Sequence, residues 1–297
     1  MGKITTVAKH EFLVNFSRKQ FQFFAFVIPA FILMLSIVFS IYSPTPPLEV
    51  LSGVNPEYWL FVVPSIIAVI FSLSIFLSAN FLLQGIAIEK ENRIMEVLIS
   101  SISFKQLLIG KIIGLGFLGI TQLFSWVAVT SIMLALSAPS LFSLALETVA
   151  TPASLFFYGV FFLLGYVLYA SLLAGIGAIT ETRGEAQQIG SLLTIFAWIP
   201  VSNILFLRTG VGGLASSVLT LFPFTAPVAA MIKVFTGTLS TYEAIMSILI
   251  LISTIAIIVS ATSRLFNVEL IMYSRDFSAK DIFFFLLKRP NSNGPKI

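Results

Sequence analysis

The sequence predicts an all-α integral membrane protein with six transmembrane helices. Hydrophobic residues make up 58% of the 297 residues, charged residues make up 10%, and the mean hydropathy is +1.02. Soluble domains carry about 25% charged residues, so this composition excludes a soluble protein as the fold class. Apolar segments long enough to cross a bilayer, about 20 residues each, recur along the chain between short polar segments. The fold class also includes an N-terminal interfacial helix, a charged cytoplasmic helix and re-entrant helices before the last span.

Several kinds of functional site are excluded by residue counts alone. The chain has no cysteine and a single histidine, His10. Disulfides, thiolate metal sites and zinc sites built from several histidines are therefore excluded. The net charge of +4 does not indicate nucleic acid binding, because the basic residues lie beside apolar segments rather than on a compact basic domain.

Residues 1–20 are expected to form a cytoplasmic amphipathic helix on the membrane surface. Basic residues accompany an apolar line with helical spacing, namely Ile4, Ala8, Phe12 and Phe16. The alternative is a disordered basic segment that only orients the first span. A signal peptide is not expected, because residues 21–42 are too long for its apolar region and no A-x-A-like site follows.

Residues 21–263 are expected to form one transmembrane domain. Apolar runs place the six spans at about residues 21–42, 57–83, 107–136, 153–179, 187–207 and 243–262. The first two spans are joined by a proline-rich loop, Ser43–Pro56, and the fourth and fifth by a polar turn, Thr180–Glu185.

The region between the fifth and sixth spans follows a different pattern. Its two apolar runs, Leu214–Phe222 and Val228–Phe235, are each too short to span and are separated by Pro223 and Pro227. Runs of this length predict re-entrant or interfacial helices. Residues 264–297 are expected to be a cytoplasmic tail.

The distribution of basic residues predicts the orientation. With six spans and a cytoplasmic N-terminus, every lysine and arginine except Arg208 and Lys233 falls on the cytoplasmic side. This agrees with the positive-inside rule and places both termini in the cytoplasm.

The densest charge in the chain lies between the second and third spans, in the segment Gln84–Lys111. Glu89 and Arg93 have the i, i+4 spacing and order that stabilise a helix, and Ile94, Val97 and Leu98 form an apolar face. This pattern predicts a short helix across the cytoplasmic ends of the spans that offers charge to a partner. The alternative is a solvated loop.

The segment does not indicate an enzyme. Its paired carboxylates are not accompanied by a nucleophile motif or metal ligands. A phosphate-binding loop is also excluded at Gly110-Lys111, because Lys105 stands where the first glycine belongs and Ile112 where Ser or Thr belongs.

The source of energy for any transport is predicted to be a separate subunit. By these boundaries Lys111 lies near the interface and the span interiors contain no Asp, Glu, His, Lys or Arg, unlike those of most ion-coupled transporters. The alternatives are a stand-alone secondary transporter or channel, and a membrane scaffold without transport. Six glycines in the third and fourth spans, Gly110, Gly114, Gly116, Gly119, Gly175 and Gly177, predict close helix packing.

The charged segment resembles that of type-2 ABC exporter permeases, especially the NatB-like branch, in the run EKENRIMEVLISSISFKQLLIGK. The run departs from the family pattern at Phe104, where a proline is common. Three later segments are also similar to the family, namely Gly184–Gln188 (GEAQQ), Phe222–Pro227 (FPFTAP) and Ser263–Lys288. The short Ser43–Pro56 loop stands where many NatB-like proteins carry a large extracellular domain.

The resemblance implies a permease subunit of an ATP-driven exporter in the plasma membrane. It implies a dimer of two permease chains embedded in membrane lipids, with each chain resting on an ABC ATP-binding subunit that carries the ATP and magnesium. No cofactor is expected in this chain. The segment 84–105 would contain the coupling helix. Residues expected to contact the ATP-binding subunit are Glu89, Glu91, Arg93, Ile94, Glu96 and Leu98, together with Glu181, Arg183 and Glu185 of the second cytoplasmic loop.

Overall fold

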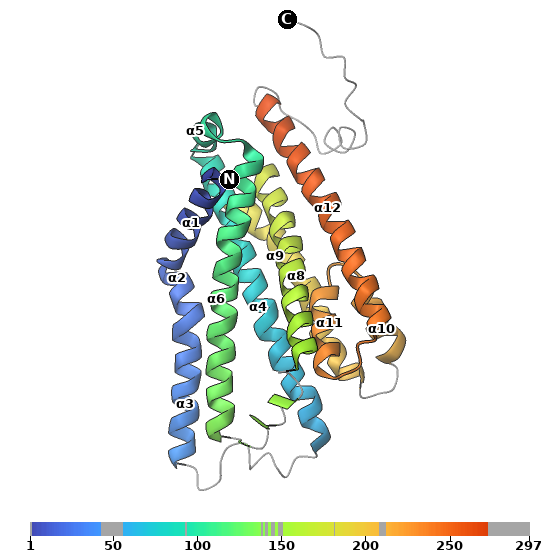
Figure 1. The fold of residues 1–297 in the computed structure, drawn as a ribbon. Coiled ribbons are helices and arrows are strands. Elements are labelled where there is room, and N and C mark those ends of the chain that lie inside the picture. The colour runs from blue at the N-terminus through green and yellow to red at the C-terminus, as the bar shows by residue number, and fades with distance from the viewer. Residues whose placement is uncertain are drawn as a thin grey trace, which may run out of the picture.

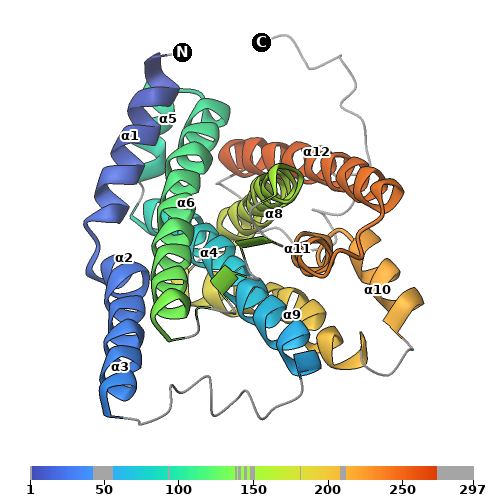
Figure 2. The ribbon, with the colours of Figure 1, turned by 60° about the horizontal axis from the view of Figure 1, so that its bottom comes forward.

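The computed structural model describes residues 2–42, 56–92, 94–137, 139, 142–143, 146–147, 151–180, 182–207 and 212–272. Helices account for nearly all of these residues, and none of them forms a strand. The helices form an elongated bundle (Figures 1 and 2), and their bounds are α1 Gly2–Phe16, α2 Lys19–Gln22, η1 Phe23–Val27, α3 Ile28–Tyr42, α4 Pro56–Glu91, α5 Ile94–Ser101, α6 Phe104–Ser137, α8 Pro152–Ile179, α9 Arg183–Leu207, α10 Gly212–Leu221, α11 Ala226–Phe235 and α12 Thr241–Met272.

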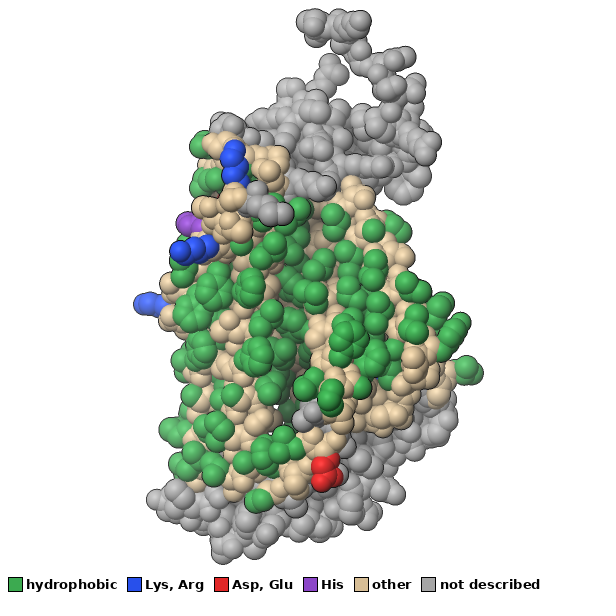
Figure 3. All heavy atoms as spheres, in the orientation of Figure 1, with side chains coloured by type: hydrophobic (Ala, Val, Ile, Leu, Met, Phe, Trp, Pro, Cys, Tyr) green, Lys and Arg blue, Asp and Glu red, His purple; other side chains and the backbone are tan. Residues whose placement is uncertain are grey.

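The bundle has two distinct ends. The N-terminus, α1 and α5 lie at one end, which we call the α5 end, and α4 and α8 finish there (Figure 1). The opposite end, which we call the α11 end, holds α10, α11 and the start of α12. Apolar side chains cover the flank between the two ends in Figure 3. This distribution is expected of helices that cross a membrane.

Four helices have the length and composition of membrane spans among the described residues. They are Ile66–Glu91, Gln106–Leu136, Pro152–Ile179 and Thr241–Thr262. The pair Gly2–Phe16 and Lys19–Leu35, bent by 67°, would be a fifth. The all-helical membrane fold is therefore confirmed, whereas the six-span topology and the interfacial position of residues 1–20 stay predictions.

Helices α4 and α8 form the centre of the bundle. In their most apolar stretches, 67% of the α4 residues and 61% of the α8 residues are buried, against 28% in α6 and 17% in α12. Tyr166 and Tyr169 of α8 are buried, and their hydroxyl groups donate to the carbonyl oxygens of Ile112 and Phe224. These bonds satisfy the phenol groups where water is excluded.

Glycines allow the helices to approach each other closely, as the sequence predicts. A Cβ atom at Gly110 would lie 2.7 Å from the Val7 side chain, and one at Gly114 would lie 2.4 Å from the Ala8 carbonyl oxygen. The Gly110 and Gly114 face of α6 therefore receives α1 backbone to backbone, which is the usual role of the G-x-x-x-G spacing between membrane helices.

The first predicted span contains a π-helical turn, η1, followed by Pro29. Proline has no backbone N–H, so it cannot donate to a carbonyl group of the preceding turn. Two neighbouring side chains of α6 supply hydrogen bonds there. Ser125 Oγ donates to the Ala25 carbonyl oxygen (2.6 Å) and Trp126 Nε1 donates to the Phe24 carbonyl oxygen (3.2 Å). Helix α6 thus satisfies backbone groups exposed by the irregular turn.

The structure changes several expected helix ends. The helix of the second span continues to Glu91, beyond the expected end at residue 83, and α12 continues to Met272, beyond residue 262. The two apolar runs before the last span form the short helices α10 and α11, as expected, although their re-entrant position stays a prediction. Most of the Ser43–Pro56 loop and residues 273–297 of the tail lie outside the described residues.

Candidate functional site

Helix α5 is a separate short helix at the α5 end of the bundle (Figure 1). Its side chains divide into two sets. Ile94 and Val97 are exposed, by 46% and 71%, whereas Leu98 packs against the hydrophobic core. The apolar face of α5 is therefore only partly covered by the bundle, and exposed apolar side chains of this kind are typical of surfaces that bind partner proteins.

The charged block does not form the single helix that the sequence predicts. Helix α4 ends at Glu91 and α5 begins at Ile94, so Glu89 lies on the long helix and Ile94 on the short one. Glu89 is directed into the bundle, where it accepts a hydrogen bond from Lys111 Nζ at 2.6 Å. Glu91 is exposed. Arg93, Glu181 and the side chain of Glu96 lie outside the described residues.

Hydrogen bonds connect α5 to α1 and the end of α4 to the end of α8. Lys3 Nζ of α1 donates to the Ser101 carbonyl oxygen at 3.0 Å, at the last turn of α5. Lys90 Nζ donates to the carbonyl oxygens of Ala178 and Thr180, at 2.8 and 2.9 Å, where α8 ends. Both lysines place positive charge at the negative end of a helix dipole.

The second predicted loop lies beside the end of α4. Arg183 donates to Gln84 Oε1 at 2.7 Å, which joins the start of α9 to α4. Arg183 and Glu185 are both exposed on the first turn of α9, whereas Ala186 is buried. The structure therefore brings the α8–α9 turn next to the end of α4, from which α5 follows.

Lys111 is the most deeply buried charged residue in the part of the chain that the structure describes. Its side chain is 2% exposed and lies between Glu11 of α1 and Glu89 of α4, whose carboxylate oxygens are 2.5 and 2.6 Å from Nζ. Asn15 Nδ2 donates to Glu11 Oε2 at 3.1 Å. We call Glu11, Asn15, Glu89 and Lys111 the Lys111 cluster. The sequence predicts a position near the membrane interface for Lys111, and Glu11 is not among the predicted site residues.

A signal for Glu11 was available in the sequence. Glu11 follows Ala8 by three residues, so the two share one face of α1. A lone carboxylate on the helix face that carries Ile4 and Ala8 indicates a buried partner of opposite charge. The partner, Lys111, is 100 residues away, and no local pattern joins them.

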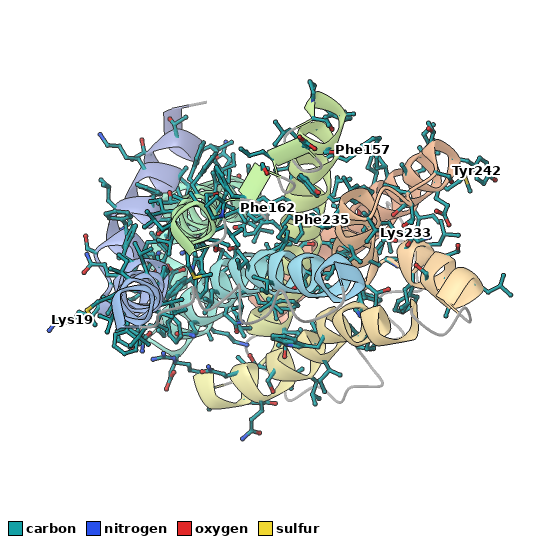
Figure 4. All side chains as sticks on the ribbon, turned by 90° about the horizontal axis from the view of Figure 1, so that it is seen from below. Lys19, Phe157, Phe162, Lys233, Phe235 and Tyr242 are labelled. Atoms are coloured by element: carbon teal, nitrogen blue, oxygen red, sulfur yellow. The ribbon has the colours of Figure 1, made fainter. Side chains whose placement is uncertain are left out.

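A second buried lysine lies at the α11 end. Lys233 of α11 is 8% exposed and donates to both carboxylate oxygens of Glu243, at 2.9 and 3.0 Å. Ser217 Oγ of α10 donates to Glu243 Oε1 at 2.5 Å. Gly237 has a φ angle of 66°, and this left-handed turn lets the chain reverse from α11 into α12. Viewed from below, Lys233 lies where α11 meets α12, far from Lys19 at the opposite edge (Figure 4). We call Ser217, Lys233 and Glu243 the Lys233 cluster.

Each cluster contains an ion pair between lysine and glutamate. Within the described ranges, no group of three or more His, Asp and Glu residues has the geometry to hold a metal ion.

Comparison with known proteins places the chain in a family. A family model described as ABC-2 family transporter protein matches residues 15–264. The chain is 28% identical over 215 residues to an uncharacterised protein of Methanocaldococcus jannaschii, covering 71% of this chain and 50% of that protein. It is 27% identical over 217 residues to the uncharacterised protein YhaP of Bacillus subtilis, covering 70% and 51%. The chain spans about half the length of these curated relatives. Since the family model covers most of its length, the chain belongs to the ABC-2 family of membrane transport proteins.

Proposed function

We propose that this chain is the permease subunit of an ATP-driven exporter in the plasma membrane. Two permease chains would form the translocation pathway among membrane lipids, and both termini would face the cytoplasm. A separate ABC ATP-binding subunit would hold ATP and magnesium and hydrolyse the nucleotide. Assignment to the NatB-like branch rests on the motif resemblance and stays a prediction.

The observation that best supports this function is the exposed apolar face of α5 at one end of the bundle. Exposed apolar side chains beside polar residues are typical of a protein interface. Ile94 and Val97 would enter a groove of the ATP-binding subunit, and Glu91 would make a polar contact at its rim. Leu98 would hold α5 on the bundle. Glu89 would act inside the chain instead, because it is bonded to Lys111.

The hydrogen bonds at this end suggest how movement would pass from α5 into the membrane. Lys3 links α5 to α1, Lys90 links α4 to the end of α8, and Arg183 links α9 to Gln84. A displacement of α5 by its partner would therefore act on several helices. In this proposal Arg183 and Glu185 form the second part of the docking surface, and Arg93, Glu96 and Glu181 are assigned to it by position in the sequence.

Co-purification tests the proposal. The tagged chain would be expressed with candidate ABC ATP-binding subunits and purified in mild detergent, and ATP hydrolysis would then be measured. The double variant E91K/V97D changes two exposed residues, so we expect a folded chain that retains less than a tenth of the bound subunit. The control is K9E, a charge reversal at an exposed residue of α1. Undiminished binding by E91K/V97D would contradict docking through α5.

The main alternative is a stand-alone secondary transporter. One observation favours it, namely that Lys111 is a buried ionisable residue within the span Gln106–Leu136, where sequence analysis expected none. Solute movement by the purified chain in vesicles without ATP would support this alternative over the exporter.

A further inference from the structure

The Lys111 cluster carries an unbalanced charge. Two carboxylates, those of Glu11 and Glu89, face one ammonium group, so the ionised side chains sum to one negative charge. Their side chains are 14% and 18% exposed, and that of Lys111 is 2% exposed. A buried charge without a partner is costly, because the interior solvates it poorly. The cluster therefore favours one additional positive charge.

The hydrogen bonds indicate where that charge belongs. Both carboxylate oxygens of Glu11 have donors, since Oε1 accepts from Lys111 Nζ and Oε2 accepts from Asn15 Nδ2. Glu89 Oε1 accepts from Lys111, but Glu89 Oε2 is buried without a donor. A buried acceptor without a donor loses the hydrogen bond that water would have supplied. Glu89 Oε2 is thus the atom at which a positive charge is missing.

A second unsatisfied atom belongs to the same cluster. Asn15 is 2% exposed, and its Oδ1 atom is also buried without a donor. Its orientation is fixed, because Nδ2 donates to both the carbonyl oxygen and Oε2 of Glu11. The cluster therefore has two oxygen acceptors that lack a proton donor, as well as an excess negative charge.

We propose that the Lys111 cluster is a proton-binding site and that Glu89 Oε2 carries the proton. One proton brings the net charge of the cluster to zero and converts the unsatisfied oxygen into a hydroxyl donor. Asn15 Oδ1 is the other oxygen of the cluster that lacks a donor. The O–H bond at Glu89 Oε2 forms as an O–H bond of hydronium in the surrounding water breaks, and no other covalent bond changes.

Three other titratable groups lie near this end. His10 precedes Glu11 on α1 and is exposed. Lys90 donates to the carbonyl groups at the end of α8, and Arg183 of α9 donates to Gln84. The charged groups that act on Glu89 are therefore Glu11 and, when protonated, His10 from α1, together with Lys111 from α6.

The Lys233 cluster provides a matched comparison. It contains one ammonium and one carboxylate, so its charges balance. Glu243 Oε1 accepts from Ser217 and Lys233, and Oε2 accepts from Lys233. This glutamate has a donor for each oxygen and is expected to stay ionised.

Infrared difference spectroscopy of the purified chain tests the proposal directly. A pH step from neutral to alkaline should remove a carboxylic acid C=O stretching band from the wild-type spectrum. E89Q should lack this band, whereas E243Q should retain it. Absence of the band in the wild-type protein, or its persistence in E89Q, would overturn the assignment to Glu89.

The pH dependence of thermal stability provides an independent measurement. The folded chain would hold a proton that a glutamate in the unfolded chain releases at neutral pH, so stability should fall as the pH rises. We expect the melting temperature to fall by a few degrees between about pH 5.5 and 8.5, and E89Q to lose most of this fall relative to E243Q. Stabilisation by sodium or potassium at constant pH, removed by E89Q, would overturn the proposal in favour of a metal-cation site. Both measurements use the chain alone, so they do not depend on an ATP-binding subunit.

Discussion

The two buried lysines of this protein are held in different ways. Lys111 joins three helices, with one carboxylate each from α1 and α4, and leaves excess negative charge. Lys233 joins α11 to α12, and Ser217 of α10 completes a neutral set. The comparison shows that a buried ion pair can serve as a fixed link, when its charges and hydrogen bonds balance, or as a titratable site when they do not.

Replacing each lysine should reveal the largest difference in stability between the two clusters. K111M would leave two carboxylates near each other with no ammonium, whereas K233M would leave one carboxylate that is 18% exposed. We expect K111M to cost about 3–5 kcal/mol of the free energy of unfolding, the range for removing one partner of a buried pair. Thermal unfolding of the purified variants measures which of the two substitutions destabilises the protein more. A larger loss in K233M would contradict the comparison.

The next largest effect should come from separating α1 from α6. In G114A the new methyl carbon would lie 2.4 Å from the Ala8 carbonyl oxygen, so α1 must move and draw Glu11 away from Lys111. We expect a loss of about 1–3 kcal/mol, as for other overpacked contacts.

The control for G114A is G159A in α8. A Cβ atom at Gly159 would have no neighbour within 4 Å, and alanine is the better helix former by about 1 kcal/mol. G159A should therefore leave the melting temperature unchanged or raise it. Equal losses in the two variants would show that the close contact with Ala8 is not the cause.

The smallest effect should come from the serine that completes the Lys233 cluster. S217A removes a donor to Glu243 but leaves the lysine in place, so we expect a loss of about 0.5–1.5 kcal/mol. Ser253 provides the control, since it is exposed and donates within its own helix to the Leu249 carbonyl oxygen. A loss in S217A no greater than that in S253A would show that the bond to Glu243 contributes little.

The sequence was informative about helices and less so about the candidate site. Long apolar runs identified the helices now seen as α4, α6, α8 and α12, because each run reflects a local requirement for apolar side chains in a bilayer. The same reasoning placed a charged segment between the second and third spans, and the structure divides this segment among the end of α4, α5 and the start of α6. The helical spacing of Glu89 and Arg93 predicted that both lie on one helix, whereas α4 ends at Glu91. Asn92 Nδ2 donates to the Ile88 carbonyl oxygen there, at the last turn of α4.

Composition and apolar periodicity alone determined that this is an all-helical membrane protein with a charged segment between spans. Such properties follow from each residue's preference for hydrocarbon or water, which is local. Only the tertiary structure decided that Glu89 lies inside the bundle while Ile94 and Val97 are exposed. It also decided that Lys111 faces Glu11 across 100 residues of sequence, because α1 packs against the glycine face of α6. Whether a charge is exposed or buried depends on which helices meet around it, and that is a property of the packed bundle.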